Sequence, residues 1–226
     1  DGADILRLWV VGSDYEDDLR IGPEILKQHA DVYRRVRNTL RYLLGGLKGF
    51  QASERVAFET MPELERWVLH RLWRLDRALR AACDDFSFHR FFADLHSFCA
   101  ADLSAFYFDV RKDALYCDPA SSAVRRAART VLDVLFETLT AWLAPFACFT
   151  AEEAWLTRHP DGASVHLRAF PETPASWQDE ALAAKWEKIR ALRRVVTGAL
   201  ELERAEKRIG SSLQAAPAVY ATADYV

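Results

Sequence analysis

The sequence predicts an all-α protein built as a helical bundle. Half of its 226 residues are apolar, which is enough for one sizeable hydrophobic core. Nine glycines and eight prolines are too few for the many tight turns of a barrel or a sandwich. Through most of the chain the apolar residues recur at the three- and four-residue steps of amphipathic helices.

Apolar periodicity and boundary signals divide the chain into predicted helices at residues 5–10, 24–47, 62–83, 87–110, 121–143, 150–156 and 179–208. The first is short and ends at a turn cluster that begins with Gly12. The second is long and amphipathic, and Pro23 suits its first turn while Gly49 ends it. The third carries its leucines on one face, which is typical of a helix packed on a core.

The later helices are marked by different signals. The fourth segment is dense in aromatic residues and is expected to be one buried helix, or two helices broken near Asp102. The fifth begins with a basic turn, becomes apolar, and is kinked or ended by Pro145. At the start of the sixth, Thr150 and Glu153 have the spacing of a capping box, in which Thr150 caps the backbone and Glu153 reaches back.

Two prolines within residues 165–176 indicate an extended crossing segment or linker. The charged helix over 179–208 has a narrow apolar seam and is expected to dock along a neighbour. We therefore predict three parts, with bounds at residues 1–21, 22–176 and 177–226. The chain starts without a methionine and ends on residues that indicate the beginning of a strand, so we expect it to be a fragment of a longer protein.

Composition and spacing exclude several classes of protein. Four cysteines lack C-x-x-C spacing and fit the reduced thiols of a cytoplasmic protein. Acidic residues interrupt the longest apolar run, so no membrane span is expected. The sequence offers no glycine-rich phosphate loop and no nucleophile–base–acid set, so we predict no catalytic residue. His96 and Cys99 lie one turn apart, and we interpret them as core rather than as a metal or redox site.

The feature that indicates a partner is a row of cations on the polar face of the 24–47 helix. At 100° per residue, these cations fall within roughly 80° of one another. We call them the basic stripe: Lys27, Arg34, Arg37, Arg41 and Lys48. Only Asp31 and the uncharged Asn38 lie nearby. A formal net charge of −3 cannot attract a polyanion by itself, but a single-signed row can meet successive phosphates of a nucleic acid. The alternative is an ordinary solvated helix face.

The 62–83 helix has a second mixed surface, on which Arg66, His70, Trp73 and Arg77 share a face away from the leucines. Aromatic rings interleaved with cations are typical of surfaces on which bases stack. Because a bundle helix often buries two faces, we favour a core position for Trp73 over a base platform.

Several strings of residues resemble the region that follows the catalytic domain in isoleucyl-tRNA synthetases, most closely the bacterial form. They are Gly2–Trp9, Tyr33–Thr39, Phe106–Cys117, Leu143–Trp155 and Lys207–Leu213. The second string reads Tyr-Arg-Arg-x-Arg-Asn-Thr and the third begins Phe-Tyr-Phe-Asp, and these two distinguish the isoleucine family from the valine and leucine families. The resemblance covers essentially the whole chain.

This resemblance implies the α-helical anticodon-binding domain of a class Ia aminoacyl-tRNA synthetase, which docks on the anticodon stem-loop of isoleucine tRNA. Residues 1–21 would connect it to its own catalytic domain, and the motifs for adenylate formation and the editing domain would lie upstream. The intact enzyme would charge the tRNA with isoleucine, using ATP and Mg²⁺, as a cytoplasmic monomer with no membrane partner. A zinc-bound cysteine module ends many bacterial members; we expect this sequence to stop before it and to hold no cofactor, zinc included.

The basic stripe and the resemblance together predict the contacts with tRNA. Arg34, Arg37 and Arg41 would position the backbone, and Asn38 would bond to it or to unstacked anticodon bases. The predicted tRNA-binding residues are Arg34, Arg37, Asn38, Arg41, Lys48, Arg66, Arg71 and Arg74. Two alternatives stay open: the same domain of a valine or leucine synthetase, and a helical protein-interaction scaffold that does not bind RNA and pairs with a partner chain through its 179–208 helix.

Overall fold

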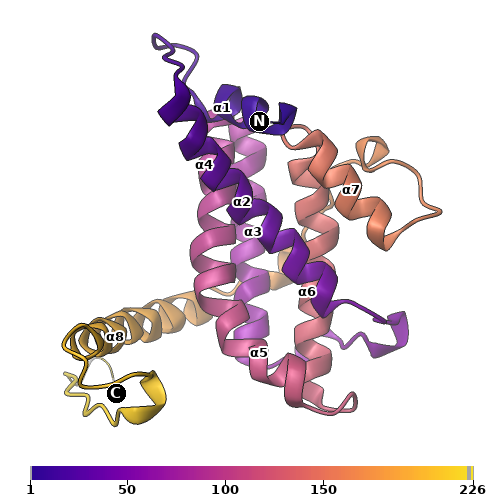
Figure 1. Cartoon of the computed structure of the whole chain (residues 1–226). Coiled ribbons are helices and arrows are strands. Elements are labelled where there is room, and N and C mark those ends of the chain that lie inside the picture. Colours follow the sequence, from indigo (N-terminus) through magenta and orange to yellow (C-terminus); the bar gives the residue numbers. More distant parts are fainter. Residues whose placement is uncertain (1, 223–224, 226) are drawn as a thin grey trace. The chain divides into compact units, whose positions relative to one another are not determined.

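The structure is a computed structural model, which describes residues 2–222 and 225. It divides into two compact units, one from Asp1 to Gln178 and one from Asp179 to Val226. Every regular element within the described residues is a helix (Figure 1). The predicted all-α fold class is therefore confirmed. None of the described helices combines the length and the hydropathy needed to cross a bilayer.

The first unit contains longer helical elements joined by loops and by single 3₁₀ turns. The long elements are α1 (Ala3–Gly12), α2 (Pro23–Gly46), α3 (Glu63–Asp84), α4 (Phe88–Ser97), the π-helix η3 (Phe98–Tyr107), α5 (Phe108–Cys117), α6 (Ala123–Leu143) and α7 (Cys148–Arg158). Single 3₁₀ turns are η1 (Ala52–Glu54), η2 (Phe58–Thr60), η4 (Val165–Leu167) and η5 (Ala175–Trp177).

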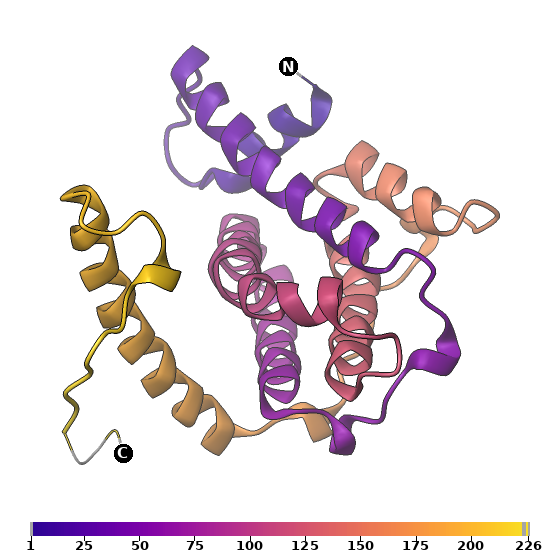
Figure 2. The same ribbon diagram turned by 60° about the horizontal axis from the view of Figure 1, so that its bottom comes forward.

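The core of this unit lies where α2, α3, α5 and α7 meet the central helix α6 (Figure 2). From Ala127 onward nearly every residue of α6 is buried. Trp142 and Phe136 of α6, Tyr107 of η3 and Phe91 of α4 are among the largest side chains without solvent contact. These residues come from the apolar and aromatic-rich segments of the sequence, as expected of a hydrophobic core.

The structure decides between the two alternatives for the aromatic-rich fourth segment. It has no break near Asp102, because α4, η3 and α5 form consecutive helical elements from Phe88 to Cys117. Asp102 is buried, and its carboxylate accepts hydrogen bonds from Nε and Nη2 of Arg71 at 3.1 and 2.9 Å. The acid therefore has a partner from another helix and does not compete for the local backbone.

The predicted capping box at Thr150 and Glu153 is wrong. Helix α7 already begins at Cys148, and its first amides are capped by Asp4 of α1. The Asp4 carboxylate accepts hydrogen bonds from the backbone N–H of Phe149 at 3.3 Å and of Thr150 at 2.9 Å, and from the Thr150 hydroxyl at 2.7 Å. Local spacing could not reveal this cap, because the capping side chain lies 145 residues earlier.

Residues 165–176 form the crossing segment that the prolines predict, and side chains of α3 hold it in place. Arg80 donates to the carbonyl of Pro171 at 2.9 Å, and the Thr173 hydroxyl donates to Asp76 at 2.8 Å. Val165 is fully buried at the start of the segment.

The second unit consists of α8 (Glu180–Ala205), η6 (Ser212–Gln214) and the residues after it. The Asp179 side chain caps α8 by accepting from the N–H of Leu182 at 2.9 Å. Within this unit, Leu192 and Val195 of α8 and Tyr220 line a cleft of about 260 Å³.

Candidate nucleic-acid interface

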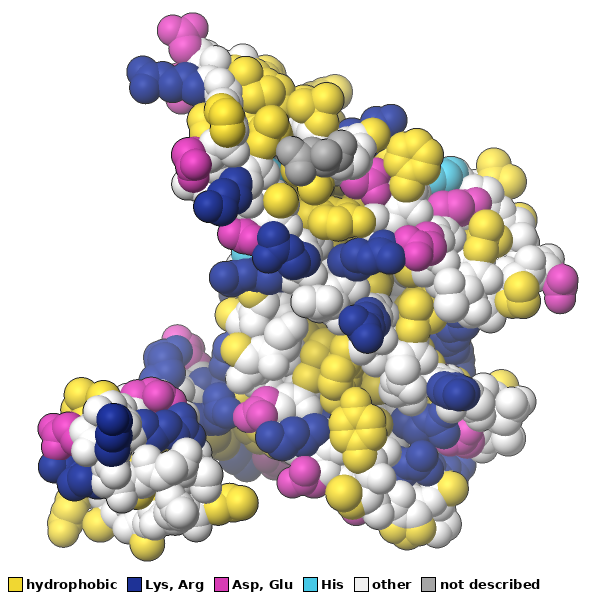
Figure 3. All heavy atoms as spheres, viewed as in Figure 1, with side chains coloured by type: hydrophobic (Ala, Val, Ile, Leu, Met, Phe, Trp, Pro, Cys, Tyr) yellow, Lys and Arg dark blue, Asp and Glu magenta, His cyan; other side chains and the backbone are white. Residues whose placement is uncertain are grey.

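The basic stripe lies on the solvent-exposed face of α2. All of its side chains are exposed, and so is Asn38. Figure 3 shows lysine and arginine side chains gathered on the face that α2 crosses, with fewer acidic ones among them. One detail of the prediction is wrong: α2 ends at Gly46, so Lys48 lies in the turn after the helix rather than on it.

Two arginines of the basic stripe are bonded to carboxylates. Arg34 Nη2 lies 3.0 Å from Asp31 Oδ1, one turn earlier on the same helix. Arg37 donates from Nη1 and Nη2 to the two carboxylate oxygens of Glu153 on α7, at 2.6 and 3.0 Å. These bonds raise the pKa of Arg37 and lower that of Glu153, so both stay charged at neutral pH. Glu153 is a residue that the sequence analysis did not place at the site.

The other members of the basic stripe differ from these two arginines. Among the described residues, the side chains of Lys27, Arg41 and Lys48, and of the neighbouring Asn38, have no hydrogen-bond or ion-pair partner. Their donors therefore face water, where an anion can reach them without displacing a protein group.

Arg129 of α6 fixes the turn that carries Lys48. Arg129 is almost fully buried and donates to the carbonyls of Gly46 at 3.2 Å and of Lys48 at 2.9 Å, and it also forms an ion pair with Glu54 at 2.5 Å. The sequence shows that α6 begins with basic residues. Among them, Arg129 has a structural role, because it donates hydrogen bonds to carbonyls at the end of α2.

The predicted tRNA contacts on α3 differ among themselves. Arg74 is exposed, and the described residues offer its side chain no partner. Arg66 is half-buried, and its Nε is enclosed without a hydrogen-bond partner among the described atoms. Arg71 forms an ion pair with Asp102, whose side chain is 7% exposed. A phosphate that binds Arg71 would have to replace this buried carboxylate. The helix pattern in the sequence did not indicate the ion pair.

The mixed face of α3 is divided between core and surface. His70 is fully buried. Trp73 is half-buried, and the guanidinium carbon of Arg77 lies 5.3 Å from its ring centroid. On α4 and η3, His96 is half-buried beside an aromatic ring, and Cys99 is buried so completely that the pKa of its thiol rises to about 12.

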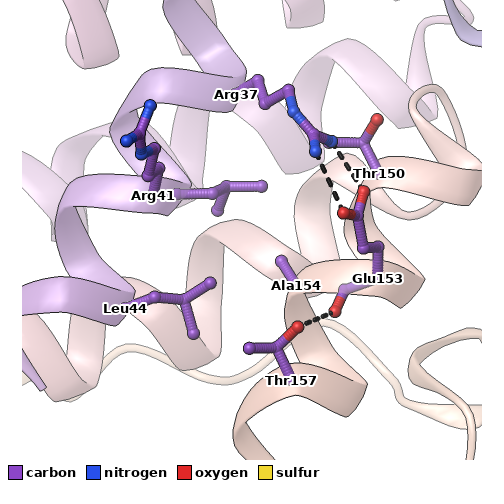
Figure 4. Close-up of a pocket in the computed structure, with 8 residues that line it drawn as sticks. Arg37, Arg41, Leu44, Thr150, Glu153, Ala154 and Thr157 are labelled. Atoms are coloured by element: carbon purple, nitrogen blue, oxygen red, sulfur yellow. Dashed lines mark hydrogen bonds and ion pairs between the residues drawn. The ribbon is translucent and has the colours of Figure 1, made fainter. Parts of the chain in front are cut away.

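Next to the basic stripe, α2 and α7 enclose a groove of about 250 Å³ (Figure 4). We call it the α2–α7 groove; its lining residues are Arg37, Leu40, Arg41, Leu44, Thr150, Glu153, Ala154 and Thr157. Figure 4 shows the Arg37 guanidinium reaching across it to Glu153, while Arg41 stays on the α2 side. Within the part of the chain that the structure describes, no three histidine, cysteine or acidic side chains are grouped to hold a metal ion.

Comparison with known proteins decides the family. Residues 65–220 match the family described as the anticodon-binding domain of tRNA ligase. The chain belongs to this family. The match begins within α3, so α2 and its basic stripe lie outside the matched range.

The most similar relatives include isoleucine–tRNA ligases. The domain is 56% identical over 219 residues to the enzyme of Agrobacterium fabrum, covering 97% of this chain and 22% of that protein. It is 57% identical over 218 residues to the enzyme of Mesorhizobium japonicum, covering 96% and 22%. The chain therefore spans about a fifth of the length of the relatives it matches. These identities, which include α2, confirm the predicted likeness to isoleucine enzymes.

A solved structure has the same fold. The LeuRS of Agrobacterium radiobacter K84, crystallised as a ternary complex with tRNA and LeuAMS, matches with a TM-score of 0.58 and 17% sequence identity. The match covers 79% of this chain and 20% of that one. At this identity the likeness shows a shared helical fold.

Proposed function

We propose that this domain binds tRNA at the anticodon stem-loop, as the anticodon-binding part of an isoleucine–tRNA ligase. The exposed cations of the basic stripe form one side of the contact. Arg41 and Lys48 can bind phosphates directly, and Arg34 can do so once its ion pair with Asp31 breaks. Such contacts hold the RNA backbone in register, while the amide of Asn38 can bond to a base edge or a sugar. The single observation that carries the proposal is the basic stripe itself, a row of exposed cations on one helix face of which only Arg34 and Arg37 are paired with carboxylates among the described residues.

For the intact enzyme we propose charging of isoleucine tRNA with isoleucine, using ATP and Mg²⁺, in the cytoplasm and as a monomer. The catalytic domain that performs this chemistry would adjoin the N-terminal part of this chain, and a zinc module would follow it. The similarity to isoleucine–tRNA ligases over 97% of the chain supports this proposal. It also favours the isoleucine enzyme over the valine and leucine alternatives and over a scaffold without RNA binding.

Binding of an isoleucine tRNA transcript tests the proposal. Gel-shift or filter-binding titrations at several salt concentrations would compare the wild-type chain with Arg34→Glu and Arg41→Glu. Each variant should weaken binding and lower the salt slope by about one for the phosphate contact that it removes. Arg90→Glu on α4, also an exposed arginine with no partner among the described residues, makes the same charge change away from α2 and is the matched control.

Two outcomes contradict the proposal. If the wild-type chain fails to bind the transcript at low salt, the scaffold alternative is favoured. If Arg34→Glu and Arg41→Glu bind like Arg90→Glu, the basic stripe is not the contact surface. A competing transcript for valine tRNA measures how much of the specificity resides in this domain.

A further inference from the structure

The α2–α7 groove has the donors of an anion site. Its lining includes two arginines four residues apart on α2, Arg37 and Arg41, so their side chains emerge from neighbouring turns. The hydroxyls of Thr150 and Thr157 are already engaged, because they donate to Asp4 and to the Glu153 carbonyl. The guanidinium groups are therefore the donors that remain for a ligand.

One of these two guanidinium groups, that of Arg37, is already bonded to a carboxylate of the protein. Glu153 accepts two hydrogen bonds from Arg37 in the forked geometry that a guanidinium also uses to bind a phosphate. A carboxylate in that position takes the place of a phosphate group. Arg41, the other cation of the groove, has no partner among the described residues.

The Arg37–Glu153 pair is exposed enough to be exchanged. The two side chains are 44% and 60% exposed, so water weakens their attraction. Other pairs between helices differ: Glu65, which binds Arg111 at 2.6 Å, is fully buried, and Asp133, which binds Arg158, is 1% exposed. Breaking those would leave a buried charge, whereas Glu153 can turn into solvent.

We propose that the α2–α7 groove is a phosphate subsite for the bound RNA, and that Glu153 occupies Arg37 until the RNA displaces it. This inference rests on the proposed function. Arg37 and Arg41 would share one phosphate of the backbone, while the apolar lining from Leu40 and Leu44 suits the adjoining sugar. Glu153 is thereby an internal competitor that lowers the affinity of the domain for RNA. It competes by displacement and not by protonation, because Arg37 holds the pKa of its carboxyl below the ordinary value.

Removing the competing charge tests this inference. Glu153→Gln should bind the isoleucine tRNA transcript about two- to fivefold more tightly than the wild-type chain, the range expected of a solvent-exposed pair. The salt slope should also steepen, because the phosphate no longer exchanges with a carboxylate. Glu153→Ala is the second variant, and a circular dichroism melt of each checks that the chain is folded.

Two controls separate the specific effect from a change of net charge. Asp161→Asn removes one exposed negative charge just after α7, at a side chain with no partner among the described residues, and should leave the affinity unchanged. In an Arg37→Gln background, Glu153→Gln should have no further effect, because the group for which Glu153 competes is gone.

The inference is overturned if Glu153→Gln and Glu153→Ala bind no more tightly than wild type, or if Asp161→Asn tightens binding equally. It is also overturned if the gain persists in the Arg37→Gln background. Each of these results leaves the proposed function standing, provided that the wild-type chain binds and Arg41→Glu weakens it. Loss of binding by the wild-type chain itself is the separate result that removes both.

Discussion

Replacing Asp4 with alanine should destabilise the first unit by about 2–4 kcal/mol, because this one carboxylate caps a helix that begins 144 residues later, at Cys148. Asp4 is 5% exposed. It accepts the backbone N–H groups of Phe149 and Thr150 and the Thr150 hydroxyl. Without it, these donors of the first turn of α7 lose their acceptor in a region where water has little access.

The magnitude follows from two contributions. Loss of a capping side chain costs about 0.5–2 kcal/mol, and a buried donor left without an acceptor costs about 1–3 kcal/mol. The negative charge of Asp4 also interacts favourably with the N-terminal end of the α7 dipole, and that interaction is lost as well. At about 2–4 °C per kcal/mol for a chain of this size, Asp4→Ala should lower the melting temperature by about 5–15 °C.

Urea unfolding followed by circular dichroism, together with a thermal melt, measures this loss. Asp4→Asn keeps one acceptor oxygen and should lose about half as much. Asp14→Ala is the matched control, because Asp14 caps only an exposed turn through the N–H of Glu16, and it should change stability by less than about 0.5 kcal/mol. The reasoning is refuted if Asp4→Ala melts within 1 °C or so of the wild-type chain.

Three further predictions concern packing and ionisation. Gly46→Ala should destabilise the chain by about 1–3 kcal/mol in urea unfolding, because its Cβ would lie 2.6 Å from a leucine methyl group of α6. Gly45→Ala meets open space and should be neutral or stabilising; equal losses would refute the packing argument. With a thiol reagent at pH 8, exposed Cys117 should label rapidly and buried Cys99 should stay unlabelled until the chain unfolds; rapid labelling of both contradicts the structure. Burial raises the pKa of Tyr42 to about 12, so its contribution to stability is complete below pH 10 and is lost as the pH rises towards 12. In Tyr42→Phe, the free energy of unfolding should therefore fall less between pH 9 and pH 11 than in the wild-type chain. An equal fall in both would show that Tyr42 is not the cause of the alkaline loss.

The helices could be predicted because their signals are local. The 3.6-residue period and the proline and glycine positions located α1, α2 and α3 to within a few residues. The exposure of the basic stripe followed from the same period, since a cation opposite the apolar face of an amphipathic helix must face water.

The errors arise where the deciding partner is distant in sequence. Thr150 and Glu153 have the spacing of a capping box. In the structure, however, the Asp4 carboxylate caps the helix by accepting from the N–H of Thr150, and the Glu153 carboxylate is paired with Arg37. Spacing left open a helix break near Asp102, and the structure instead pairs its carboxylate with Arg71, 31 residues away. In both cases the deciding partner is a tertiary one, which spacing along the chain cannot reveal.

For the same reason, a row of arginines in the sequence suggests more unpaired positive charge than the structure has, because Arg34 and Arg37 are paired with carboxylates. These two ion pairs differ in what their breaking would cost. Asp31 lies on the same helix as Arg34, so releasing Arg34 changes no contact between helices. Glu153 lies on α7, so releasing Arg37 removes a bond that joins α7 to α2. A phosphate that takes Arg34 would therefore compete with a surface ion pair alone, while one that takes Arg37 would also remove a bond between two helices. Helix α7 would then still be held by the Asp4 cap, by the hydrogen bond between Tyr33 and Thr150, and by the ion pair between Arg158 and Asp133.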